Sequence, residues 1–78
     1  MIKNSSKFSK MDINKKFQET LALYQEGNLK EAADAIEKLI KISAQNADFL
    51  HLAALIKKSQ NEIGRAEDYF RKSLSVIP

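Results

Sequence analysis

The sequence contains no cysteine and no tryptophan, and only one proline and two glycines among its 78 residues. Without cysteine the chain has no disulfide framework and no thiolate to bind a metal or act as a nucleophile. It has no apolar run of the length that a secretory signal or a membrane span requires, so we expect a cytoplasmic protein without a membrane anchor. The length is that of one small domain, whose single core gives little net stability.

The net charge of +3 is concentrated at the amino terminus. Residues 1–16 carry five lysines and one aspartate, whereas the rest of the chain carries eight basic and nine acidic residues. Residues 1–11 lack a periodic apolar face, so we predict a disordered basic tail there. The alternative is that Phe8 docks on the folded part. A basic tail can bind nucleic acid, but no basic face with interleaved aromatic residues accompanies this one, which argues against that partner.

Most of the chain repeats itself at a spacing of 34 residues. Residues 29–32 (Leu-Lys-Glu-Ala) align with residues 63–66 (Ile-Gly-Arg-Ala), and Ile36 aligns with Phe70. A period of this length is typical of a unit made of two antiparallel helices. Inside each unit apolar residues recur at three- and four-residue steps, which predicts four helices separated by short turns.

The pattern resembles that of the tetratricopeptide repeat family. The resemblance covers residues 12–78, with repeat 1 at 13–46 and repeat 2 at 47–78, and it implies an all-α fold of two helix-turn-helix repeats. Such repeats form an antiparallel four-helix segment of an α-α superhelix. Thr20 and Lys57 depart from the pattern, since the family usually has glycine and tyrosine there. The residues that match are Gly27, Leu29 and Ala32 in the first repeat and Leu50, Ile63, Ala66, Phe70 and Pro78 in the second.

The resemblance implies a non-catalytic module that binds a partner protein or peptide in a concave groove. In this family one face of the first helix of each repeat lines the groove, which here gives Asn14, Phe17, Leu21, Tyr24, Gln25, Asp48, His51, Leu55, Lys58 and Ser59. The apolar members would contact an extended or helical peptide, and His51 and Lys58 would select its polar groups. The opposing interpretation is that Leu21 and Leu55 belong to the core and that His51 is an ordinary surface residue.

The sequence offers no recognisable catalytic, cofactor or metal site, so we predict that the chain is not an enzyme and needs no cofactor. His51 is the single histidine, and no glycine-rich turn accompanies a serine that it could activate. Glu31, Asp34 and Glu37 follow one another at three-residue steps, with lysines further along the same predicted helix. This spacing indicates a salt-bridged solvent face rather than a metal site.

The last predicted helix has more apolar residues than one neighbouring helix can cover. We place Ile63, Phe70, Leu74 and Ile77 on the side that faces its own partner helix, and Tyr69 and Val76 near the side where a third repeat would stack. Exposed apolar surface of this kind marks an interaction site. This predicts either self-association of the chain, as a homodimer, through its C-terminal helix, or a continuation of the chain that covers these residues.

A second interpretation makes the chain one part of a larger protein. Several of its residues resemble the degenerate repeats that precede bacterial glycosyltransferase, sulfotransferase or methyltransferase domains, namely Phe17, Leu21, Tyr24, Gly27 and Leu29, with Leu50, His51 and Leu52 in the second repeat. That resemblance implies an amino-terminal adaptor segment of a bacterial enzyme.

Overall fold

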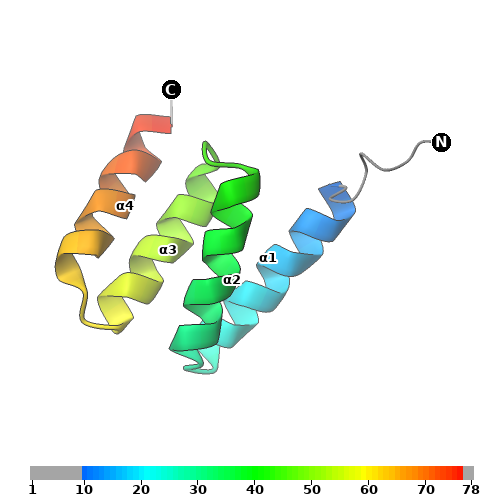
Figure 1. Ribbon diagram of the computed structural model, residues 1–78, viewed down its shortest axis with the longest axis horizontal. Helices are drawn as coiled ribbons and strands as arrows, with labels where there is room; N and C mark the ends of the chain where they lie inside the picture. Colours follow the sequence, from blue (N-terminus) through cyan, green and yellow to red (C-terminus); the bar gives the residue numbers. More distant parts are fainter. Residues whose placement is uncertain (1–9, 77–78) are drawn as a thin grey trace.

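The computed structural model describes residues 10–76, which contain four α-helices and no strand. The helices are α1 (Lys10–Gln25), α2 (Leu29–Ile42), α3 (Ala47–Ser59) and α4 (Ile63–Val76). Consecutive helices run antiparallel, and α3 lies between α2 and α4 (Figure 1). The predicted tail lies outside the described residues, except that Lys10 and Met11 are helical. The all-α fold of two helix-turn-helix repeats is confirmed.

The two repeats turn from their first to their second helix in the same way. Gly27 and Asn61, 34 residues apart, both adopt left-handed backbone conformations, with φ of 85° and 69°. In both turns the next residue donates its backbone N–H to the carbonyl five residues earlier, at 2.9 Å after Gly27 and 2.8 Å after Asn61. Glycine adopts this conformation without steric cost, and asparagine tolerates it better than most residues. The same turn chemistry therefore ends the first helix of both repeats.

The hydrophobic core lies mainly between α2 and α3. Its central cluster is Ala32, Ala33, Ile36, Leu39, Phe49, Leu52, Ala53 and Ile56. Ala32 and Ala66 occupy equivalent positions in the two repeats, and both are buried. Thr20 is buried too, and its hydroxyl donates a hydrogen bond to the Lys16 carbonyl at 2.7 Å. The bond satisfies the hydroxyl, which explains how a threonine fits where the family usually has glycine.

Lys57, the other departure from the family pattern, is only 6% exposed. Its Nζ lies 3.9 Å from Oε2 of Glu37 on α2 and 3.8 Å from Oε2 of Glu62. Glu62 also contacts Arg65 at 3.5 Å. A buried ammonium group needs such partners, so the cluster links α2, α3 and the start of α4. Glu37 therefore pairs with α3, not with a lysine of its own helix as the solvent-face interpretation implied.

The orientation of α4 differs from the prediction. Ile63 and Leu74 are 49% and 69% exposed, so the expectation that they face α3 is wrong. Ile77, expected on the same side, lies outside the described residues. Tyr69 and Val76 instead line a recess on the side of α2 and α3. The small side chain of Ser73 faces α3. Its hydroxyl donates a hydrogen bond to the carbonyl of Ala47, the first residue of α3, at 3.3 Å. Small residues let the two helices approach closely, which fixes the rotation of α4 about its axis.

Candidate interaction surfaces

The ten residues predicted to line a groove all belong to α1 and α3, and these two helices contact each other. The rings of Phe17 and Phe49 join them, with centroids 5.3 Å apart and planes tilted by 36°. Six of the ten side chains are exposed: Asn14, Gln25, Asp48, His51, Lys58 and Ser59. The other four are half-buried: Phe17, Leu21, Tyr24 and Leu55.

The half-buried side chains contact the core with part of their surface. Phe17, Leu21 and Tyr24 pack against the central cluster, and the rest of each side chain stays open to solvent. His51 is exposed but not isolated, because its ring and that of Phe70 on α4 pack in a T-shaped arrangement with a centroid distance of 5.5 Å. These contacts hold the apolar row of α1 and the histidine of α3 in defined positions.

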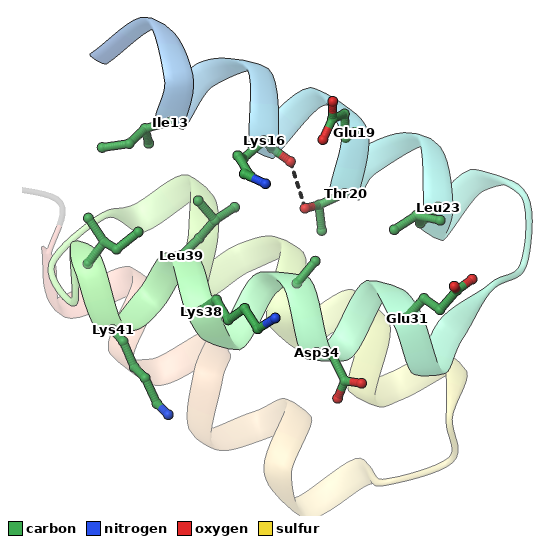
Figure 2. Close-up of a pocket in the computed structure, with 12 residues that line it drawn as sticks. Ile13, Lys16, Glu19, Thr20, Leu23, Glu31, Asp34, Lys38, Leu39 and Lys41 are labelled. Atoms are coloured by element: carbon green, nitrogen blue, oxygen red, sulfur yellow. Dashed lines mark hydrogen bonds between the residues drawn. The ribbon is translucent and has the colours of Figure 1, made fainter. Parts of the chain in front are cut away.

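A cleft of about 480 Å³ lies between α1 and α2 (Figure 2). Ile13 and Leu23 from α1 and Leu39 and Ile42 from α2 supply its apolar lining, and Thr20 lies between the two helices. None of the ten predicted groove residues lines this cleft. Sequence reasoning missed it because its size depends on how far α1 and α2 diverge, which apolar spacing does not encode.

Charged residues of both signs surround the apolar lining, and they are separated along the cleft. Lys41 lies near the end marked by Ile13, whereas Glu31 lies near the end marked by Leu23 (Figure 2). The full set of charged lining residues is Lys16, Lys38 and Lys41 with Glu19, Glu31 and Asp34. An occupant with an apolar side chain at the first end and a cation at the second would match this distribution.

Two further properties limit the chemistry of residues 10–76. In that range no group of three or more His, Asp or Glu side chains comes close enough together to hold a metal ion. None of its four helices has the length and hydropathy required to cross a bilayer.

Burial raises the pKa of Tyr69, the Glu37 carboxylate adds to that increase and the Arg65 guanidinium opposes it. Its protonated form is therefore favoured in the folded chain.

Comparison with known proteins assigns the fold to a family. A model described as tetratricopeptide repeat matches residues 21–46 and 47–78, which together make up more than half of the chain. The boundary between the two matches falls where α3 begins. No curated protein and no solved structure gives a significant match. The chain belongs to the tetratricopeptide repeat family, whose members are typically non-catalytic and generally mediate protein–protein interactions.

Proposed function

We propose that the face formed by α1 and α3 binds an extended or helical peptide of a partner protein. The observation that carries this proposal is the row of half-buried side chains Phe17, Leu21 and Tyr24 along α1, whose inner surfaces contact the core. These side chains offer apolar surface to a ligand, and their packing against the core already fixes their positions. Binding then costs less side-chain entropy than it would on a mobile surface.

The polar residues of α3 give this face its selectivity. His51 and Lys58 are exposed and lie close to two helical turns apart, on either side of half-buried Leu55. A peptide with an apolar anchor and a carboxylate would place the anchor against Leu55 and the carboxylate near Lys58. The proposed ligand is therefore a short peptide that combines one or two apolar side chains with an acidic one.

Selection from a random peptide display library against the full chain tests this proposal. We expect selected peptides to lose at least about tenfold in affinity, or 1.4 kcal/mol, when Tyr24→Ala or Leu55→Ala is introduced. Lys58→Ala should remove the preference for acidic peptides. Lys38→Ala, a change of the same type on α2, serves as the matched control and should leave affinity unchanged. Peptides that are insensitive to all three groove changes would refute the proposed binding face.

A specific observation also favours self-association through α4. Ile63 and Leu74 are its two strongly exposed apolar residues, and they lie about three helical turns apart, on one side of the helix. In an antiparallel pair of α4 helices related by a two-fold axis, Ile63 of one copy meets Leu74 of the other at both ends. The same arrangement brings Glu67 close to Arg71 of the second copy, twice per dimer.

Sedimentation of the full chain at micromolar concentration tests this dimer. We expect Leu74→Glu to abolish a concentration-dependent dimer and Ser75→Glu, which adds the same charge one residue later, to leave it intact. Glu67→Arg should weaken the dimer, and the double change Glu67→Arg with Arg71→Glu should restore it. A wild-type chain that stays monomeric over the whole concentration range would refute self-association without bearing on peptide binding.

A further inference from the structure

The cleft between α1 and α2 has an apolar floor. Ile13 and Leu23 mark its two ends on α1 and lie about 15 Å apart along the helix, and Leu39 adds to the floor from α2 (Figure 2). Thr20 is buried between them, and its hydroxyl is bonded to the Lys16 carbonyl, so it adds no unsatisfied polar group to the floor. An occupant of the cleft therefore meets apolar surface over a length of nearly three helical turns.

The charged residues that line the cleft are divided by sign. Because α1 and α2 run antiparallel, the lysines of both helices gather in the half next to Ile13, and the acidic residues of both gather in the half next to Leu23 (Figure 2). Within residues 10–76 none of these charged side chains belongs to a salt bridge, so their charges remain available to an occupant. In chain order they are Lys16, Glu19, Glu31, Asp34, Lys38 and Lys41.

The neighbouring side of α1 does not suit a whole further repeat or a second copy of the chain as the occupant. On α3, buried Phe49 and Leu52 belong to the central cluster that joins the second repeat to α2. The 34-residue shift aligns these two residues with Lys15 and Gln18, which are both exposed. A repeat seated there would have to bury an ammonium group and an amide against apolar surface, which is costly. The narrow apolar floor fits a single segment with charged flanks instead.

The walls of the cleft favour a helical segment over an extended one. Both walls are α-helices, whose backbone N–H and C=O groups are already bonded within each helix. An extended peptide on the apolar floor would leave its own backbone groups without partners, whereas a helix satisfies them internally. A helix with apolar residues at three- and four-residue steps presents a continuous stripe to such a groove.

We propose that the α1–α2 cleft binds one amphipathic helix of a partner protein, which carries acidic side chains in its first turn and basic side chains in its last turn. This charge placement also stabilises the helix itself, because it complements the helix dipole. The acidic first turn meets Lys16 and Lys41 at the Ile13 end, and the basic last turn meets Glu31 at the Leu23 end. The bound helix therefore runs parallel to α1. The proposal goes beyond peptide binding by the α1–α3 face, because it uses a different surface.

Two hydrocarbon-stapled peptides of 14 residues, the length of α2, test the proposal against the full chain by fluorescence anisotropy. Both carry the same leucine stripe and the same composition; one has glutamates in its first turn and lysines in its last, and the other has these charges exchanged. At low salt we expect the first peptide to bind at least about tenfold more tightly than the second. The difference should shrink in about 1 M salt, where charges are screened within about 3 Å. The double change Lys38→Glu and Lys41→Glu should remove the preference, whereas Lys58→Glu on α3 is the matched control and should keep it.

Methyl-labelled NMR spectroscopy shows where the first peptide binds. We expect it to shift the methyl signals of Ile13, Leu39 and Ile42 and to leave that of Leu55, on the other face, in place. Ile42 is 39% exposed, so Ile42→Glu should keep the fold, as circular dichroism verifies, and weaken binding at least about tenfold. Leu74→Glu, the same type of change on α4, is the matched control and should leave binding unchanged.

Three outcomes would overturn the proposal: equal affinities of the two peptides, shifts of Leu55 in place of the cleft methyls, or no binding of either peptide at about 1 mM. Tyr24→Ala and Leu55→Ala, which test the α1–α3 face, should leave binding of the first stapled peptide unchanged. Failure of one proposed binding surface can therefore be distinguished from failure of the other.

Discussion

Nζ of Lys57 on α3 lies 3.9 Å from Oε2 of Glu37 on α2, and Lys57 is buried where its family usually has tyrosine. This ion pair connects the two repeats, because Glu37 belongs to the first and Lys57 to the second. A buried ion pair that is well satisfied adds little net stability over an apolar pair of the same size, but leaving one partner alone is costly. The cluster therefore has different consequences for different substitutions.

We predict that the double change Glu37→Gln and Glu62→Gln lowers the free energy of unfolding by about 1 to 2 kcal/mol. The loss is smaller than for a fully buried pair because the two glutamate side chains are 46% and 43% exposed. Lys57→Met removes the buried charge itself and should be close to neutral. Urea unfolding measures both. A greater loss for Lys57→Met than for the double change would show that the charge is needed in its own right.

The buried alanine of the second repeat leads to a prediction about packing. Ala66→Leu should lower the free energy of unfolding by about 1 to 3 kcal/mol, because extra methyl groups at a tight helix contact force neighbouring side chains and backbone apart. Ala22→Leu on the exposed side of α1 is the matched control and should have little effect. An unchanged thermal midpoint for Ala66→Leu would mean that α4 packs loosely at this point.

The 34-residue period was enough to predict the all-α fold of two helix-turn-helix repeats. It sets which residues of the two repeats are equivalent, and Gly27 and Asn61 indicate by residue type where the helices end. It does not fix the rotation of each helix about its axis. For α4 the small residues Ala66 and Ser73 decide that rotation, and the larger Leu74 consequently points to solvent.

The interaction surfaces were predicted less completely for a related reason. Phe17, Leu21 and Tyr24 could be placed on one side of α1 from their spacing, and that placement rests only on helical periodicity. The α1–α2 cleft depends on the angle between two helices, which follows from the whole set of contacts along them. Lys57 was equally hard to interpret from sequence, because its burial depends on Glu37 from α2 and on Glu62 in the turn before α4.

The pH dependence of stability follows from Tyr69, whose pKa is raised above its ordinary value of 10.0 mainly by burial and then by Glu37. A raised pKa in the folded state means that this group contributes stability below the unfolded-state pKa and loses that contribution as pH rises through the folded-state value. We therefore expect the Tm to fall on going above pH 10. The Tm of the Tyr69→Phe variant should fall less steeply over the same pH range. Identical slopes for the two proteins would contradict this assignment.

Replacing each of the two glycines of the chain with alanine should change the free energy of unfolding in opposite directions. Gly27 has φ of 85°, and a Cβ there would meet no atom within 4 Å, so the cost of Gly27→Ala is backbone strain alone, about 1 kcal/mol. Gly64 lies in the first turn of α4 with equally free space around a Cβ. Gly64→Ala should raise the free energy of unfolding by up to about 1 kcal/mol, because alanine loses less backbone entropy in a helix. Urea unfolding of the two variants beside the wild-type chain measures the difference. If both changes shifted stability in the same direction, the left-handed turn at Gly27 would not be the conformation that ends α1.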